Sequence, residues 1–119
     1  MARTGAIVIR WDRVAKGREA MALEAFGQAL GYFEELAKEG RIVAHREYFA
    51  SNGEGMMVVE GLLPELYRIV QEDDHIRNMT RGGAVTEGLT MQVMAGGSDQ
   101  TVQELIGITT GVEAELGLL

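Results

Sequence analysis

The sequence contains no cysteine, a single proline and few aromatic residues. Without cysteine, the chain has no disulfides, no thiolate metal ligands and no cysteine nucleophile. No apolar run approaches the ~20 residues of a membrane-spanning helix, and no secretory signal is recognisable near the first residue. These absences predict a cytoplasmic domain that depends on its hydrophobic core for stability.

Positive charge is also scarce, because 11 Lys and Arg residues stand against 18 Asp and Glu residues, for a net charge of −7. Phosphate contacts need clustered Lys and Arg, so we do not expect a nucleic-acid partner. An anionic membrane surface would repel the chain for the same reason. The sequence contains no phosphate-binding loop, serine-nucleophile elbow or zinc motif, and no cofactor is expected.

The residues that are present are enough for one folded domain. The 119 residues fit a single domain, and 46% of them are hydrophobic, so a core can form. We expect one domain over residues 1–119, with its core over about 6–95 and a C-terminal helix over about 98–117. A chain of this size still buries only part of its surface, which makes self-association a useful source of further burial.

Runs rich in β-branched residues alternate with stretches whose apolar residues recur every three or four positions. This alternation predicts two strand–helix–strand halves. Strands are expected over 6–11, 42–50, 56–60 and 85–95. The first crossover helix is expected over about 16–38 and is ended by Gly40. The second begins at Pro64, has a break near Asp73–Asp74, and ends at Gly82–Gly83.

The first expected helix has one apolar face and two internal glycines. Steps of three and four residues place these apolar side chains together: Leu23, Phe26, Leu30, Phe33 and Ala37. Gly27 and Gly31 each weaken a helix by about 1 kcal/mol relative to Ala. Glycines four apart are typical either of close packing against a neighbour or of variation on an exposed face, and both interpretations stay open.

Asn52–Gly53, between two β-prone runs, is the strongest hairpin signal in the chain. It joins the two halves, each of which needs a right-handed crossover. Halves joined in this way predict an α+β domain of the ferredoxin-like type, β-α-β-β-α-β, with an antiparallel sheet in the order 4-1-3-2. That order places the first and third strands at the centre, and these are the most apolar of the four.

The first and third strands are apolar on both faces, although both crossover helices must cover the same face of the sheet. Along the third strand, Met57 and Val59 alternate with Met56 and Val58. A half-solvated strand would instead alternate apolar with polar residues. The second face must therefore be covered, either by the C-terminal helix or by another copy of the chain. Because glycines interrupt that helix, we expect a homodimer that associates through the sheet face.

The pattern over about residues 6–95 resembles small uncharacterised bacterial proteins of the dimeric α/β-barrel superfamily. The resemblance is carried by Val58–Gly61, Glu65–Leu66, Met79, Gly88–Leu89 and the stretch from Val93 to Gly96–Gly97. It implies that two sheets pack face to face across a dimer axis. It does not imply one activity, because the superfamily includes cofactor-independent monooxygenases, muconolactone-type isomerases, YCII-related proteins and haem enzymes.

The two histidines are the first candidates for chemistry. His45 and Glu47 lie two apart on the second strand and share a face, about 7 Å apart, which is long for a direct bond. They are either a base with its orienting carboxylate or part of a charged, solvated edge strand, and we favour the edge strand. His75 follows Asp73–Asp74, so we expect a surface histidine with a raised pKa. With His45 and Glu47, it could also form a two-histidine, one-carboxylate metal site.

The arginines are candidates for pairing or for anion binding. Arg10 is unusual as a charge on a central strand, and we expect it to pair with Glu60 near the end of the neighbouring strand. Arg77 and Arg81 lie four apart on the second helix. They either bind a small acid or pair with Asp73 and Asp74, and we favour the pairing.

Aromatic and methionine residues are candidates for the wall of a pocket. Trp11, Tyr48 and Tyr67 could line it, and Met57 and Met91 would supply an adaptable apolar surface. Residues of these kinds at strand spacing are more often ordinary core.

Three functions fit these observations. The first is a homodimer that is purely structural or binds a small apolar or anionic ligand. The second is a cofactor-independent monooxygenase- or isomerase-like enzyme acting on an aromatic or lactone-like substrate, with His45 as base and Arg10 or Tyr48 steering an anionic oxygen. The third is a haem or metal protein with His45 or His75 as ligand.

Overall fold

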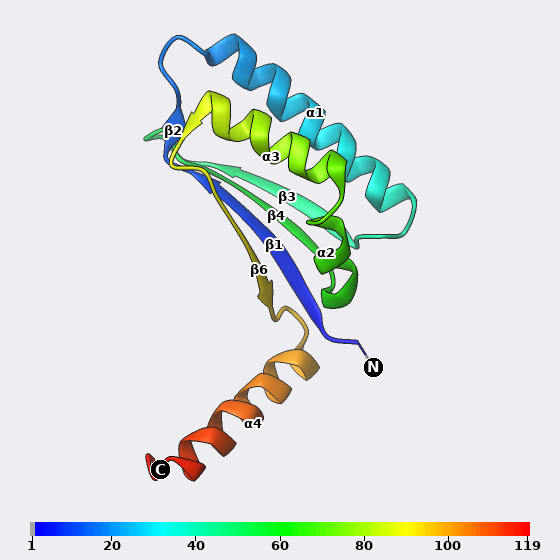
Figure 1. Ribbon diagram of the computed structural model, residues 1–119, viewed down its shortest axis with the longest axis vertical. Helices are drawn as coiled ribbons and strands as arrows, with labels where there is room; N and C mark the ends of the chain where they lie inside the picture. The colour runs from blue at the N-terminus through cyan, green and yellow to red at the C-terminus, as the bar shows by residue number, and fades with distance from the viewer. Residues whose placement is uncertain (1) are drawn as a thin grey trace.

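The computed structural model describes residues 2–119 and shows an α+β domain with four helices packed around or extending from an antiparallel sheet (Figure 1). The sheet consists, in spatial order, of β3 (Ala44–Phe49), β4 (Gly55–Leu62), β1 (Thr4–Trp11) and β6 (Thr90–Ala95). The helices are α1 (Glu19–Lys38), α2 (Leu63–Ile69), α3 (Asp73–Val85) and α4 (Asp99–Glu115). The predicted α+β class is confirmed.

The two central strands, β1 and β4, pair antiparallel along their whole length, from Thr4 opposite Leu62 to Trp11 opposite Gly55. β6 pairs with the free side of β1, and β3 with the free side of β4. The first and third predicted strands are therefore central, as expected. Strands with neighbours on both sides bury the most side-chain surface, which is why the most apolar runs occupy these positions.

Two short strands form a second sheet that the sequence did not predict. β2 (Arg13–Val14) pairs with β5 (Thr86–Glu87), so the single strand expected over 85–95 is in fact two. Gly88 separates β5 from β6 with a φ of +72°, and the carboxylate of Asp12 occupies the space that a Cβ at this position would need. A positive φ and a close neighbour both favour glycine here.

Helix α1 packs on the sheet through most of the predicted face, because Phe33 is in the core and Phe26, Leu30 and Ala37 pack against it. Phe33 is fully buried as expected, but Leu23 is 75% exposed, and the small residues Ala22 and Ala29 face the sheet instead. A Cβ at Gly27 or Gly31 would meet nothing within 4 Å, so these glycines lie on an exposed face and do not mark close packing. Gly40, with a φ of +74°, follows the end of the helix as predicted.

The hairpin signal is confirmed between β3 and β4. The turn is closed by the amide of Ala50, which donates to the carbonyl of Glu54 at 2.9 Å. The side-chain oxygen of Asn52 accepts from the amide of Glu54 at 3.1 Å, and Gly53 has a φ of +96°. The Asn-Gly pair thus supplies both the local hydrogen bond and the positive φ that this turn requires.

The second crossover is broken into α2 and α3, as the sequence indicated. Pro64 lies in the first turn of α2, and α3 begins at Asp73. The expected stop at Gly82–Gly83 is wrong, because α3 continues to Val85. Leu89 packs over the two glycines, 3.6 and 3.7 Å from where their Cβ atoms would be, so the helix continues beneath this side chain.

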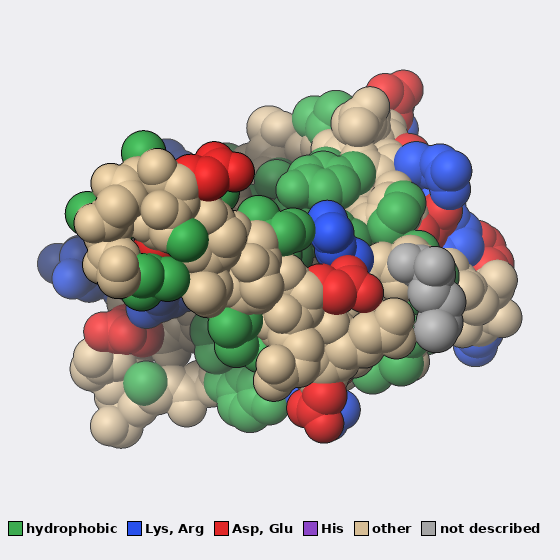
Figure 2. Space-filling view, turned by 90° about the horizontal axis from the view of Figure 1, so that it is seen from below, with side chains coloured by type: hydrophobic (Ala, Val, Ile, Leu, Met, Phe, Trp, Pro, Cys, Tyr) green, Lys and Arg blue, Asp and Glu red, His purple; other side chains and the backbone are tan. Residues whose placement is uncertain are grey.

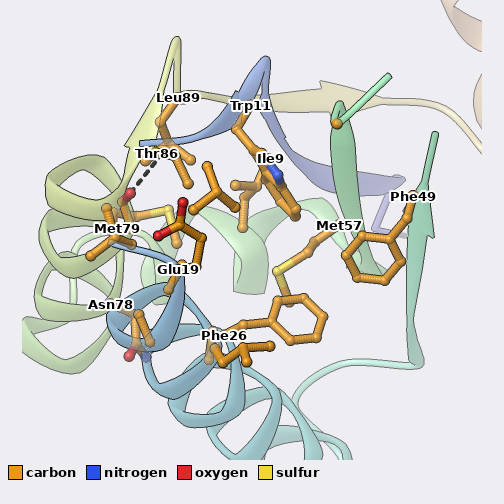
Figure 3. A pocket seen from close by; sticks show the side chains of 18 residues that line it. Ile9, Trp11, Glu19, Phe26, Phe49, Met57, Asn78, Met79, Thr86 and Leu89 are labelled. Carbon is orange, nitrogen blue, oxygen red and sulfur yellow. Dashed lines mark hydrogen bonds between the residues drawn. The ribbon is translucent and has the colours of Figure 1, made fainter. Parts of the chain in front are cut away.

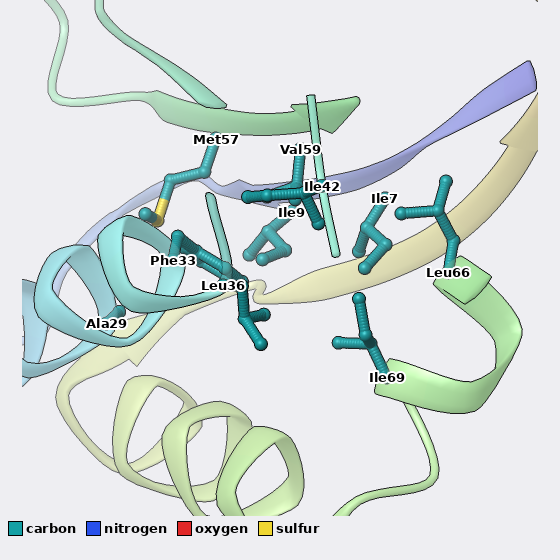
Figure 4. Packing of buried hydrophobic residues seen from close by; sticks show 10 residues of the cluster. All are labelled: Ile7, Ile9, Ala29, Phe33, Leu36, Ile42, Met57, Val59, Leu66 and Ile69. Atoms are coloured by element: carbon teal, nitrogen blue, oxygen red, sulfur yellow. The ribbon is translucent and has the colours of Figure 1, made fainter. Parts of the chain in front are cut away.

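The hydrophobic core lies between one face of the sheet and the helices α1, α2 and α3 (Figure 4). The strands contribute alternate residues such as Ile7, Ile9 and Val59, and α2 contributes Leu66 and Ile69. Burial of each such side chain stabilises the fold by roughly 1.5–3 kcal/mol. We call this side of the sheet the helix face.

The other side of the sheet, which we call the open face, is covered by no helix within the described range 2–119 (Figure 1). The strand registers place these residues on it: Ala6, Val8, Arg10, Ala44, Arg46, Tyr48, Met56, Val58, Glu60, Thr90, Gln92 and Met94. Helix α4 extends away from the body instead of folding under the sheet. The alternative in which the C-terminal helix covers this face is therefore not what the chain adopts.

Within residues 2–119, none of the helices combines the length and the apolar character that crossing a bilayer requires.

Candidate functional site

A cavity of about 440 Å³ lies between the helix face and the helices α1 and α3 (Figure 3). It is at the end of the domain where β1 finishes, α1 starts and the β3–β4 turn lies. The exposed lining residues Val14, Leu23 and Phe49 mark its mouth. A cavity of this size is in the usual range for a site that encloses a small organic molecule.

Three aromatic rings form one wall of the cavity. The ring centres of Phe26 and Phe49 are 5.4 Å apart, and Trp11 lies 6.5 Å from Phe26 and 6.3 Å from Phe49, each pair edge to face. Trp11 lies flat over Gly55, where any Cβ would overlap the indole ring. Edge-to-face aromatic contacts hold such rings in fixed orientations, so this wall is preformed.

Small residues from both helices leave space in the cavity. Ala22 and Ala29 on α1 and Gly82 on α3 line it, and none of the three has a side chain long enough to fill it. Met57 from the sheet and Met79 from α3 border the same space. Methionine side chains are flexible and polarisable, so they can adjust to the shape of a guest.

Polar groups in the lining are few and are already engaged. Thr86 Oγ1 donates to the carbonyl of Gly82 at 2.7 Å (Figure 3). Glu19 Oε1 accepts from the amide of Gly17 at 3.2 Å, and Asn78 Oδ1 accepts from Arg81 at 3.1 Å. No Lys, Arg or His lines the cavity. The lining therefore provides no cationic group for an anionic ligand.

His45 and Glu47 are in direct contact, contrary to the prediction that their spacing is too long. His45 Nδ1 lies 2.6 Å from Glu47 Oε2, because both side chains lean toward each other on the same face of β3. The pair is mostly buried beneath α1, with the His45 ring 6.2 Å from Phe33. The favoured interpretation of a solvated edge is thus wrong for these residues. Neither residue lines the cavity.

His75 is buried, whereas the sequence predicted a surface histidine with a raised pKa. It is 1% exposed, with its ring 6.3 Å from those of Tyr32 and Phe33. Burial lowers the pKa of His75, since the charged form would lose its hydration. Its position in the first turn of α3 turns this side chain toward the sheet, which the adjacent carboxylates in the sequence did not reveal.

Two polar atoms near His75 lack hydrogen-bond partners among residues 2–119, namely His75 Nδ1 and the Tyr32 hydroxyl. His75 Nε2 lies 3.0 Å from the sulfur of Met91. Burial also raises the pKa of Tyr32 to about 12, so its hydroxyl stays protonated. None of these three residues lines the cavity.

The metal site that was considered as an alternative from the sequence does not assemble. His45 and His75 each pack against Phe33, but Glu47 bonds to His45 alone. Among the residues that the structure describes, no three His, Cys, Asp or Glu side chains lie close enough together to hold a metal ion.

Arg10 was predicted to pair with Glu60, and the structure shows that it does not. Glu60 accepts from Arg46 Nε at 3.0 Å, while Arg10 lies opposite Met56 at the far end of the strand. Arg10 is exposed on the open face and forms no ion pair with any residue in the range 2–119. Tyr48 is on the same face, also opposite Met56, so these two residues do not meet His45, which is on the helix face.

Some of the remaining candidate residues line the cavity and others lie outside it. Trp11 and Met57 line the cavity, whereas Glu47, Tyr48, Tyr67 and Met91 do not. Tyr67 is half exposed on α2.

One ion pair predicted for the second crossover helix is confirmed on α3. Arg77 pairs with Asp74 at 3.1 Å, as expected. Arg81 instead donates to Asn78, also at 3.1 Å. Neither arginine is a residue of the cavity wall.

Sequence reasoning missed Phe26 and Phe49 as site residues. Trp11 and Phe49 are the last residues of β1 and β3, which run in the same direction because each pairs antiparallel with β4 between them, and Phe26 lies in the first half of α1. In a sheet of known order, aromatic residues at one common end are a signal for a cavity wall. That signal requires the strand order before it can be used.

The chain matches no model of a known protein family and none of the curated proteins. The resemblance to dimeric α/β-barrel proteins therefore stays a prediction. The function of the cavity must be argued from its geometry.

Proposed function

We propose that the protein binds a small, neutral, largely apolar molecule in the cavity between the sheet and the helices α1 and α3. The observation that carries this proposal is the lining: an aromatic wall and methionine side chains enclose about 440 Å³, with no cation among them. Sites for small molecules are typically concave and apolar with a few polar groups.

The shape of the wall favours a flat ring compound. Trp11, Phe26 and Phe49 present ring faces and edges, which stack well with an aromatic or alicyclic guest. Among the described residues, Glu19 is the one charged residue of the lining, and it is exposed to solvent. A carboxylate accepts hydrogen bonds and repels anions, so a ligand with a neutral hydroxyl or amine suits this end better than a carboxylic acid.

The enzymatic alternatives gain no support from the site. His45, the base considered from the sequence, does not line the cavity, and Arg10 and Tyr48 are on the opposite face of the sheet. A haem or metal bound in the cavity would find no histidine in the lining. Binding without catalysis is the function that the described side chains can perform.

We also infer that the chain forms a homodimer through its open face and has the ferredoxin-like arrangement. If the four strands of the sheet are counted in chain order, β1, β3, β4 and β6 become strands 1 to 4. Their spatial order, starting from β6, is then 4-1-3-2. Val8 and Val58 lie opposite each other at the centre of the open face, and the charged pair Arg46–Glu60 lies toward its edge. An apolar centre with a polar rim is the usual anatomy of a protein–protein interface.

The binding proposal is tested with N-phenyl-1-naphthylamine, a neutral aromatic dye whose fluorescence rises in apolar surroundings. Saturable binding at one site per chain is expected. Ala22→Phe places a ring in the cavity and should weaken binding at least about tenfold, equivalent to about 1.4 kcal/mol. The matched control is Ala20→Phe, the same change on the exposed side of α1.

Circular dichroism is the folding control, and both variants should show the wild-type helix content. Absence of saturable binding, or equal affinity in the Ala22→Phe and Ala20→Phe variants, would overturn the proposal. A bound dye should also raise the melting temperature, by an amount that grows with the logarithm of the dye concentration once this exceeds Kd.

A further inference from the structure

Helix α4 has an apolar face that none of residues 2–119 covers. With about 3.6 residues per turn, Leu105, Ile108, Val112 and Leu116 share a face with Thr101 at the base of the helix. Ile108 is 53% exposed and Leu116 is 67% exposed. Contiguous apolar surface of this kind is typical of an interaction site.

Hydrogen bonds at the base of α4 fix the direction in which it leaves the body. The amide of Thr4 donates to Thr101 Oγ1 at 3.0 Å, and Ser98 Oγ caps the helix by accepting from the amide of Thr101. Arg3 Nε donates to Glu104 Oε2 at 2.9 Å on the first turns of the helix. Folding α4 back onto its own sheet would break these bonds, so its apolar face is directed toward another molecule.

The base of α4 and the open face border one groove of about 550 Å³. Val8, Val58 and Met94 line it from the open face, and Thr4 and Ser98 line it next to the helix. Figure 2, the view from the α4 end, shows hydrophobic side chains at the surface both on the projecting helix and on the body beside it. The two uncovered apolar surfaces therefore meet at this groove.

We propose that α4 of each copy packs against the open face of a second copy, so that the two chains exchange their C-terminal helices. This proposal rests on the inferred homodimer and says which element covers the partner. Each chain supplies both halves of the contact, which is the condition for a closed two-fold interface. The proposed occupant of the open face is thus a segment of the same chain.

Charge supports a second copy as the partner. Helix α4 carries carboxylates and neither Lys nor Arg; its acidic residues are Asp99, Glu104, Glu113 and Glu115. The open face carries Arg10, whose guanidinium has no ion-pair partner in the part of the chain that the structure describes. An anionic bilayer, the other common acceptor of a half-apolar helix, would repel these carboxylates.

The test compares two aspartate variants within one turn of α4 by sedimentation equilibrium of the full chain. Ile108→Asp places a charge on the apolar face and should raise the dimer Kd at least about tenfold. Thr110→Asp adds the same charge on the opposite side of the helix and should change Kd less than about twofold. Neither residue belongs to the core, so both variants should keep the wild-type helix content.

Val58→Asp on the open face separates this proposal from the dimer itself. If Val58→Asp dissociates the dimer and Ile108→Asp does not, α4 has no role in it and the helix exchange is refuted, while the dimer stands. A monomeric wild-type chain would refute both. Binding of the wild-type chain to phosphatidylcholine–phosphatidylserine vesicles, lost in Ile108→Asp, would also overturn the exchange in favour of a membrane.

A second measurement uses the absence of cysteine, because a single introduced cysteine takes a single label. A nitroxide on Val112→Cys should be immobilised in the wild-type background and released when Val58→Asp is added. The matched label on Ala114→Cys, on the polar side of α4, should be mobile in both backgrounds. Equal mobility at the two positions in the dimer would contradict the proposal.

Discussion

The two faces of the sheet are built from alternate residues of the same strands, yet the chain treats them differently. On β4, Val59 is fully buried beneath α1, whereas its neighbour Val58 is only partly buried on the open face. Both residues are valine, so the difference comes from which elements cover each face. Burial on the helix face explains why the chain folds, whereas the exposed apolar centre of the open face is what the proposed homodimer would account for.

The largest expected effect comes from placing the same charge on each face in turn. Val59→Asp buries a carboxylate without a partner and should cost several kcal/mol, enough to unfold a domain of ordinary stability. Val58→Asp should leave a folded chain that sediments as a monomer. Circular dichroism and sedimentation velocity measure the two outcomes.

The two results must differ in kind for the comparison to hold. If Val58→Asp unfolds the chain at every protein concentration, the open face is as necessary for folding as the helix face, and the contrast between them fails. If Val58→Asp stays a dimer, the open face is not the dimer interface.

A smaller effect is expected within helix α1, where the sequence placed Leu23 and Phe33 on one apolar face and the structure buries only Phe33. Phe33→Ala removes a fully buried ring and should lower the free energy of unfolding by about 3–5 kcal/mol. Leu23→Ala, at a side chain that is 75% exposed, should lower it by less than about 0.5 kcal/mol. Urea denaturation measures both, and equal costs would mean that the predicted apolar face was correct after all.

The smallest effect concerns the pH dependence of the helix face. Burial lowers the pKa of His75 in the folded chain, so between that pKa and the unfolded value near 6.5 the unfolded chain binds a proton that the folded chain does not. The free energy of unfolding should therefore fall as the pH drops below about 6.5, with a slope of at most about 1.4 kcal/mol per pH unit. His75→Phe should flatten this slope.

The matched control is His45→Gln, which removes the half-buried histidine and leaves His75 in place. Urea denaturation from pH 8 to pH 5.5 measures the slope for each variant. A slope that persists in His75→Phe and disappears in His45→Gln would assign the pH dependence to His45 and contradict the prediction.

Much of the fold followed from local patterns. Asn52–Gly53 marked the hairpin and Pro64 the start of α2, because each depends on backbone geometry that the residue itself favours. The site followed less well. Trp11 and Met57 were among the candidates, but the small residues that leave the cavity open, such as Ala22 and Gly82, carry no chemical signal in a sequence.

The errors share one physical origin, which is that sequence distance does not give the direction of a side chain after packing. His75 beside two aspartates suggested a charged surface, yet the turn of α3 directs the ring into the core. His45 and Glu47 met because their side chains lean together, and Arg10 lost its expected partner because the register placed Glu60 opposite Ala6.

By itself, the sequence determined the α+β class, the central positions of the two most apolar strands and the excess of apolar residues on the open face. These depend on periodicity and on apolar content, which are properties of the chain alone. Only the tertiary structure decided that a cavity lies at the aromatic end of the domain and that α4 projects away from it. Cavities and helix directions depend on how separate elements pack, since a gap or an exposed face is defined only by neighbours distant in the sequence.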